Sequence, residues 1–239
     1  MVKAVVFDID NTLYSYDNAH AVAWEALCAY AREQLMMDAD TFARCHKAAQ
    51  TIVKERLGAD CAALHNRQLR YQVLLEESGK PLHHAIAMND LYWNTLIAAA
   101  EPTPGIMECL AALKKAGYVL GIGTDMTIDY QLKKLVKLRM LPYFDFIVSS
   151  EEVNVEKPHE KLFACCARKA GVPAQQCLFI GDSLKKDYHG SSGAGMESVW
   201  YCPDPAMAEA NPQIRKISHY DQLREMLLRQ KGLENETRL

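Results

Sequence analysis

The second half of the chain alternates apolar runs of strand length with segments of helical period, and this alternation restricts the possible folds more than any other feature. Strands are predicted over Val119 to Thr124, Phe144 to Ser149, Cys177 to Gly181 and Ser198 to Cys202. Helices are predicted over Ile128 to Leu138, Glu160 to Ala170 and Tyr220 to Arg229. Strands that alternate with helices form βαβ units with parallel strands. The sequence therefore predicts an α/β fold with a doubly wound parallel sheet.

One more strand is expected at the start of the chain, because Val2 to Phe7 is an almost continuous apolar run. Such a run is typical of a strand that is buried on both faces of a parallel sheet. At the other end, Gln230 to Leu239 is polar, and we expect it to be frayed.

The first strand is followed by a long block of helical period, in which Asp17 and Asn18 form the expected helix cap. One apolar stripe of this block is made of Leu82, Ile86, Asn89, Trp93 and Leu96. The block ends at Glu101-Pro-Thr-Pro-Gly105, which suits a linker. We therefore expect a core of residues 1–16 and 101–239 and a second, smaller all-helical cap domain of residues 17–100.

Composition and charge exclude several classes of protein. The formal net charge of −3 on 239 residues gives no reason to expect nucleic acid or an anionic membrane as a partner. There is no long apolar run and no signal-peptide pattern, so a cytoplasmic location is expected. The 8 cysteines form no C-x-x-C pair, which suits reduced thiols in the core. A small diffusible partner is the expectation.

Polar residues follow the predicted strands where each of them ends. They are Asp8, Asp10, Asn11 and Thr12 after the first strand, Thr124 and Asp125, Lys157, and the run from Gly181 through Asp182 to Asp187. Parallel strands place their carboxyl ends at one edge of the sheet, so these side chains can converge in one crevice. Carboxylates gathered there would repel one another, and a divalent cation, Mg²⁺, together with Lys157 would relieve that repulsion.

Each of these groups is weak evidence alone, since a D-x-D after a strand is usually a turn and G-D-S is an ordinary strand-to-helix connection. Their order and spacing around a cap-sized insertion are more specific. In these motifs the sequence resembles the haloacid dehalogenase-like hydrolase superfamily, in its phosphatase branch with a helical cap inserted after the first motif. The resemblance covers nearly the whole chain and implies a Rossmann-like core.

The resemblance implies a role for each residue of the motifs. Asp8 would be the nucleophile that forms an aspartyl-phosphate, and Asp10 the general acid and base. Thr124 would hydrogen-bond a phosphoryl oxygen, and Lys157 would neutralise the nucleophile and the phosphoryl group. Asp182 would hold Mg²⁺ together with Asp8 and the backbone carbonyl of Asp10, with Asp187 as a further ligand or an orienting group.

Some neighbouring residues are less constrained by the motifs. Asn11 is expected at the phosphate or the substrate. Many relatives have an asparagine where this chain has Asp125, and we expect only the backbone N–H of Asp125 to serve the phosphate. Tyr14, Tyr16 and Asp17 could touch substrate or pack the first cap helix.

The expected function is a Mg²⁺-dependent phosphatase that hydrolyses a phosphomonoester of a small phosphorylated metabolite, as a monomer or a homodimer. A phosphomutase, a phosphonatase or a dehalogenase of the same superfamily remain alternatives, although a dehalogenase needs neither metal nor Asp10. A metabolite-binding protein without turnover is the alternative from another class. The complete set of motif residues argues against it.

Overall fold

The computed structural model describes residues 1–58 and 61–236 of the chain. Its centre is a six-stranded sheet in the order β3-β2-β1-β4-β5-β6, and every neighbouring pair within this part of the chain is parallel. The strands are β1 (Ala4–Phe7), β2 (Val119–Thr124), β3 (Phe146–Ser149), β4 (Cys177–Gly181), β5 (Glu197–Tyr201) and β6 (Lys216–Ile217). The predicted doubly wound parallel sheet is confirmed.

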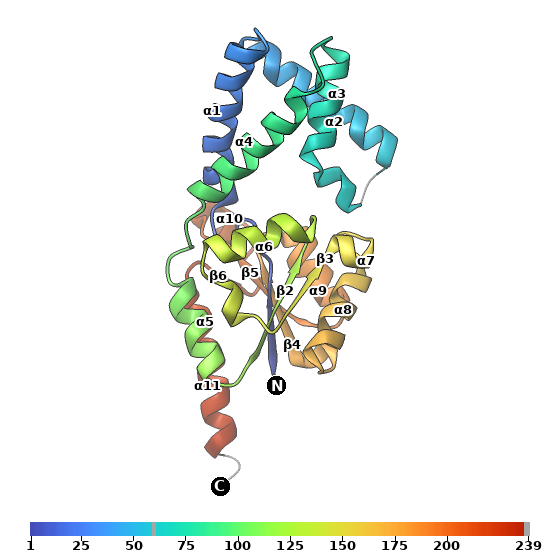
Figure 1. The fold of residues 1–239 in the computed structure, drawn as a ribbon. Helices are drawn as coiled ribbons and strands as arrows, with labels where there is room; N and C mark the ends of the chain where they lie inside the picture. Colours follow the sequence, from blue (N-terminus) through green and yellow to red (C-terminus); the bar gives the residue numbers. More distant parts are fainter. Residues whose placement is uncertain (59–60, 237–239) are drawn as a thin grey trace.

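Helices precede, connect and cover these strands (Figure 1). The first group is α1 (Tyr16–Gln34), α2 (Ala39–Leu57), η1 (Ala62–His65), α3 (Arg67–Glu77) and α4 (His84–Ala99). The rest are α5 (Ile106–Lys115), α6 (Ile128–Lys137), η2 (Leu141–Tyr143), α7 (Ser150–Val153), α8 (Glu160–Ala170), η3 (Ala174–Gln176), η4 (Leu184–His189), α9 (Gly190–Gly193), α10 (Pro205–Glu209) and α11 (Tyr220–Glu236). Among the described helices, none combines the length and apolar character needed to cross a membrane.

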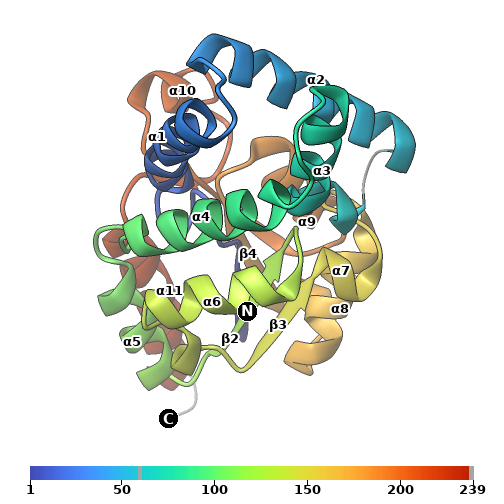
Figure 2. The same ribbon diagram turned by 45° about the horizontal axis from the view of Figure 1, so that its top comes forward.

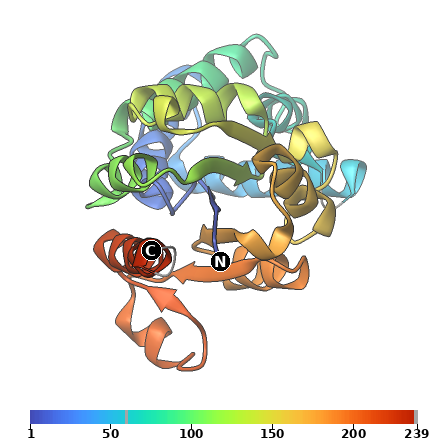
Figure 3. The same ribbon diagram turned by 90° about the horizontal axis from the view of Figure 1, so that it is seen from below.

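Both faces of the sheet are buried, because successive side chains of a strand point to opposite faces. Val5 and Phe7 of β1 belong to the core cluster that contains α5 and α11, whereas Ala4 and Val6 belong to the cluster that contains α8. Figure 3 shows the sheet between these two helical layers. The continuous apolar run at the start of the chain is therefore explained by a strand with no solvent-facing side.

Helices α1 to α4 form a separate layer beyond the carboxyl ends of the strands (Figures 1 and 2). Within this layer α1 packs on α4 and α2 packs on α3. The layer meets the core where α4 runs beside α6: Asn89 Nδ2 donates to Tyr130 Oη at 2.9 Å, and the Trp93 ring stacks on the Tyr130 ring at 4.0 Å. The helical layer is thus held above the edge of the sheet where the motif residues lie.

The structure corrects the expected start of the first helix and the expected end of the last one. Helix α1 begins at Tyr16, and its N-cap is Ser15, whose extended backbone lets its side chain accept from the N–H of Asn18. The terminal helix does not fray at Gln230 but continues to Glu236, since its polar residues include good helix formers; the last three residues of the predicted frayed segment, 237–239, lie outside the described residues.

The apolar stripe expected at Leu82 to Leu96 is buried only in part. Leu82 lies in the turn before α4 and is 52% exposed, and Ile86 is 58% exposed on the solvent side of that helix. Asn89, Trp93 and Leu96 are buried as expected. The short edge strand β6 carried no recognisable pattern of its own and was not predicted.

Candidate active site

The first motif lies where β1 ends, and the backbone there keeps Asp8 in the sheet. The N–H of Asp8 donates to the carbonyl of Ile180 at 2.9 Å, which continues the pairing of β1 with β4. The chain then turns sharply, with Asn11 in the left-handed region at φ 56°. Asp8 is consequently fixed by a buried strand, while Asp10 follows in the turn and can aim its side chain elsewhere.

Lys157 lies between two carboxylates. Its Nζ is 2.6 Å from Asp8 Oδ1 and 2.7 Å from Asp187 Oδ1, and its side chain is 3% exposed. Burial alone would lower the pKa of Lys157, but Asp187 and Asp8 hold that pKa well above its ordinary value. The ammonium group is therefore charged and placed against the predicted nucleophile.

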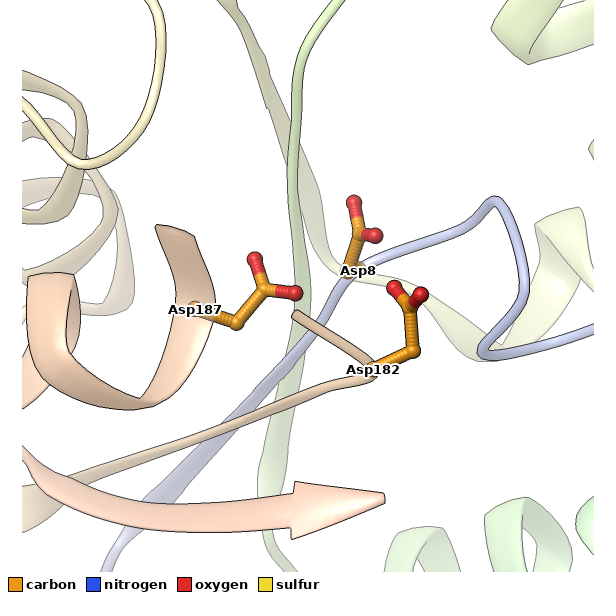
Figure 4. A group of neighbouring side chains, drawn as sticks. All are labelled: Asp8, Asp182 and Asp187. Carbon is orange, nitrogen blue, oxygen red and sulfur yellow. The ribbon is translucent and has the colours of Figure 1, made fainter. Parts of the chain in front are cut away.

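Asp8, Asp182 and Asp187 come together at this edge of the sheet (Figure 4). One ligand oxygen from each carboxylate lies within 4.8 Å of the others. Burial raises the pKa of Asp182 to about 6, and the neighbouring Asp187 adds to the effect. Burial likewise raises the pKa of Asp8, against the attraction of Lys157. Both shifts reflect first the burial of these carboxylates and then their repulsion of one another.

The chemistry of this acidic cluster fits a hard divalent cation. Its donors are carboxylate oxygens, the ligands that Mg²⁺ prefers. Gly181 leaves room for the cluster, because a side chain at that position would collide with the Asp187 carboxylate. The backbone N–H of Ser183 donates to Asp187 Oδ2 at 2.9 Å, and the N–H of Asp182 donates to Thr12 Oγ1 at 3.1 Å. The loop after β4 is thus built to present these carboxylates.

Thr124 and Asp125 close the site from the end of β2. Gln131 Nε2 donates to Thr124 Oγ1 at 2.8 Å, and Thr124 is 1% exposed. The Asp125 carboxylate accepts from the backbone N–H of Lys157 at 2.9 Å and from Lys186 Nζ at 2.8 Å. The negative charge of Asp125 is therefore compensated by Lys186, and its other oxygen accepts from the backbone.

Asp10 forms an ion pair with a lysine that the sequence analysis missed. Lys134 of α6 is 0% exposed, and its Nζ lies 2.6 Å from Asp10 Oδ1. Tyr14 Oη donates to the same oxygen at 2.5 Å, and Gln131 Nε2 donates to Oδ2 at 3.3 Å. Burial would raise the pKa of Asp10, but Lys134 and these hydrogen bonds lower it. Gln131 and Lys134 are three positions apart, so they lie on one face of α6. This spacing is the signal in the sequence that could have identified them.

The remaining candidates are placed beside the site rather than in the acidic cluster. The Asn11 side chain pairs with Asp17, through Nδ2 to Asp17 Oδ2 and through Oδ1 from the Asp17 N–H, both at 3.1 Å. Tyr16 Oη accepts from Arg67 at 2.6 Å. The Asn11 side chain is therefore hydrogen-bonded to the start of α1, and the Tyr16 hydroxyl to Arg67 of the helical layer.

A cavity of about 210 Å³ opens over the motif residues. Asp8, Thr124, Lys157 and Asp182 line it from the core, and His65 of η1 lines it from the helical layer. A larger cavity of about 550 Å³ adjoins at Asn11 and Asp182, but no lysine, arginine or histidine of the described residues lines it. The smaller cavity therefore combines the carboxylate predicted as nucleophile, the Lys157 ammonium group and the acidic cluster.

Comparisons with known proteins identify the family of this chain. A family model for haloacid dehalogenase-like hydrolases matches residues 2–195. Ribulose-1,5-bisphosphate 5-phosphatase of Halopiger xanaduensis is 32% identical over 85% of this chain and 86% of its own. Glyceraldehyde 3-phosphate phosphatase of Methanopyrus kandleri is 34% identical, covering 83% of each chain.

The fold is also that of a solved structure, a 2-haloacid dehalogenase from Pseudomonas syringae pv. Tomato. It is 25% identical, has a TM-score of 0.77, and covers 96% of this chain and 99% of its own. Phosphatases and dehalogenases thus share this architecture, so the choice of reaction depends on the residues of the site.

Proposed function

We propose that this chain, which belongs to the haloacid dehalogenase-like hydrolase family, hydrolyses the phosphomonoester of a small metabolite through an aspartyl-phosphate on Asp8. The observation that carries the proposal is the position of Lys157 Nζ, 2.6 Å from Asp8 and 2.7 Å from Asp187, beside Asp182. A carboxylate nucleophile meets strong repulsion from a phosphate dianion, and positive charge at this point removes it.

Asp8, Asp182, Asp187 and the backbone carbonyl of Asp10 would hold Mg²⁺. When bound, the ion would supply further positive charge to the phosphoryl oxygens as charge develops on them. Burial raises the pKa values of Asp8 and Asp182, and the neighbouring carboxylates raise them further, so a bound cation would stabilise their ionised forms.

In the first step Asp8 attacks phosphorus, so that a bond from its carboxylate oxygen to phosphorus forms and the bond to the substrate oxygen breaks. Asp10 gives its proton to that leaving oxygen. Lys157, the Thr124 hydroxyl and the backbone N–H of Asp125 hold the phosphoryl oxygens. In the second step Asp10 takes a proton from water, the water oxygen bonds to phosphorus, and Asp8 is released with inorganic phosphate.

Asp10 is suited to both steps by its surroundings. Lys134 and Tyr14 keep it ionised in the free protein, the form that accepts a proton from water. A phosphate dianion that enters beside it brings negative charge, which favours the protonated form needed for the first step.

The substrate class follows from the size of the site and from the relatives. The relatives are named for ribulose 1,5-bisphosphate and glyceraldehyde 3-phosphate, both small phosphorylated sugars. Residues 17–100 act as the cap that limits substrate size and excludes water. A cytoplasmic location, with the 8 cysteines as free thiols, and a monomer or homodimer complete the proposal.

A screen of phosphate release from small sugar phosphates with Mg²⁺ tests the proposed function. Asp8→Asn removes the nucleophile, and we expect the rate to fall by at least about 10⁴-fold; a chelator should have a comparable effect that added Mg²⁺ reverses. Asp129→Asn, which changes an exposed carboxylate on α6, is the matched control. Turnover that persists in Asp8→Asn, or halide release in place of phosphate release, would contradict the proposal.

A further inference from the structure

A third cavity lies within the helical layer, and the proposed phosphatase mechanism does not use it. It measures about 480 Å³ and is lined by Tyr16, His20, Trp24, His46, Gln50, His65, Arg67 and Arg70. We name it the cap cavity. Its lining contains two guanidinium groups and three imidazoles but no carboxylate among the described residues, so its chemistry is the reverse of the acidic cluster below it.

Arg67 is buried without an ion-pair partner. The residue is 9% exposed, one of its N–H groups donates to Tyr16 Oη at 2.6 Å, and its guanidinium carbon lies 3.9 Å from the centre of the Tyr92 ring. No carboxylate in the described part of the chain forms an ion pair with it. The aromatic contact stabilises the charge, but several of its five N–H donors remain unused.

Arg70 adds a second positive charge to the same cavity. Its Nε donates to the backbone carbonyl of Leu64 at 3.1 Å, which fixes the side chain without neutralising it. His46 is 9% exposed, and its Nε2 has no hydrogen-bond partner. A buried polar atom without a hydrogen-bond partner lowers the stability of the fold. An aromatic contact explains Arg67 alone, but it explains neither the second guanidinium nor the unpaired imidazole nitrogen.

Two histidines of the cavity, His46 and His20, are disfavoured in their charged form. Burial, together with the nearby charges of Arg67 and Arg70, lowers the pKa of His46 to about 4. Burial and Arg67 also lower the pKa of His20. The two arginines therefore supply positive charge to the cap cavity that His46 and His20 do not.

The cap cavity adjoins the cavity over the motif residues. His65 lines both, and its Nε2 lies 2.6 Å from Glu156 Oε1, which joins the helical layer to the core. The negative charge of Asp10 also acts on Arg67. One small molecule whose phosphate lies against Asp8 can accordingly reach past His65 toward Arg67 and Arg70.

We infer that the cap cavity binds a second anionic group of the substrate, so that the enzyme acts on small phosphomonoesters that carry a carboxylate or a second phosphate at the far end of the carbon chain. This inference rests on the proposed function. Guanidinium groups bind either anion through paired N–H···O hydrogen bonds.

Three probes with one carbon skeleton test the inference: ribitol 5-phosphate, 5-phosphoribonate and ribitol 1,5-bisphosphate, which end in a hydroxyl, a carboxylate and a phosphate. We expect kcat/KM with Mg²⁺ to be about 10- to 100-fold higher for at least one of the anionic probes than for ribitol 5-phosphate, the range given by a charge-assisted hydrogen-bond pair. The better of the two identifies the anion.

Arg70→Gln should reduce this preference at least about tenfold, mainly through KM. Arg67→Lys keeps a positive charge over the Tyr92 ring but loses the paired N–H donors of the guanidinium group. It should therefore reduce the preference as well. Arg44→Gln changes an exposed arginine of α2 and is the matched control. A preference that survives both variants, or equal kcat/KM for the three probes, overturns the inference.

Equilibrium binding separates this inference from the proposed function. Calorimetry with Asp8→Asn and Mg²⁺ measures the preference among the three probes without turnover. An anion preference in binding, with no phosphate release by the unmodified enzyme, would support anion binding in the cap cavity and contradict the proposed phosphatase function. Phosphate release with no anion preference would support the phosphatase function and contradict anion binding in the cap cavity.

Discussion

The edge of the sheet and the helical layer bury opposite kinds of charge, and they treat it differently. At the sheet edge Lys157 pairs with Asp8 and Asp187, and Asp125 pairs with Lys186. In the cap cavity Arg67 and Arg70 are held by a hydroxyl, an aromatic ring and a carbonyl. In the proposed function the first region would bind the phosphoryl group that all phosphomonoesters share, whereas the second, which has no carboxylate partner among the described residues, would bind the part in which they differ.

Burial has opposite consequences for the two regions. It raises the pKa values of Asp8 and Asp182 at the sheet edge, and it lowers those of His46 and His20 in the helical layer. The physical cause is the same in both, since burial disfavours whichever form is charged. Substitutions in each region can therefore test whether this division of roles holds.

The largest effect is expected at Lys157. Lys157→Met leaves Asp8 and Asp187 buried without their cation, so we expect phosphatase turnover to fall at least about 10³-fold and the free energy of unfolding to fall by about 3–5 kcal/mol at pH 7. Steady-state kinetics and urea unfolding measure the two losses.

Lys169→Met is the matched control, because Lys169 pairs with Glu152 at the surface and such a pair contributes less than about 1 kcal/mol. If both variants unfolded with the same free energy, the sheet edge would not be the paired, buried region described above.

Lys134 stands between the two regions and should give an intermediate effect. Lys134→Met removes the cation beside Asp10, so kcat should fall about 10²-fold with a smaller change in KM. Because Lys134 lowers the pKa of Asp10, the acidic limb of the kcat profile should move to higher pH in the variant.

Lys133→Met changes the adjacent exposed lysine, which pairs with Asp129, and should leave both quantities near those of the unmodified protein. An unmoved pH profile in Lys134→Met would show that this lysine supports the fold rather than positioning Asp10.

The smallest effect is expected at His46 and concerns stability. Its pKa is about 4 in the folded chain, against an ordinary value of 6.5. Between these values the unfolded chain binds a proton that the folded chain does not, so the free energy of unfolding decreases as the pH falls from 6.5 to 4. The expected loss from this one group is about 3 kcal/mol.

Urea unfolding at pH 7 and at pH 4 measures this loss, and His46→Gln should remove it. His83→Gln, at an exposed histidine of the same layer, should leave it in place. Equal losses in the two variants would refute the view that His46 is buried in its neutral form.

Residues at strand ends were the part of the site that could be predicted. Asp8 and Asp182 directly follow β1 and β4, and Thr124 is the last residue of β2; these three strands are neighbours in the sheet. Their convergence depends only on the strands being parallel, a property that the alternation of strands and helices already implied.

Positions on helices could not be predicted in the same way. Lys134 contacts Asp10 only because α6 turns one particular face toward the sheet edge. Lys186 contacts Asp125 only because η4, which packs on β4 and β5, places its side chain there. The cap cavity depends on how α1, α2 and α3 cross, and the period of a helix does not encode the angle at which it packs.

The sequence by itself determined the order of strands and helices, the buried character of the first strand and the set of polar residues at the strand ends, because local periodicity and chain direction are properties of the linear chain. The tertiary structure alone decided which cation accompanies Asp10, how the charge of Asp125 is compensated, and that Arg67 and Arg70 face one cavity. These outcomes depend on side chains from segments far apart in the chain meeting at distances of a few ångströms, and packing between elements sets those distances.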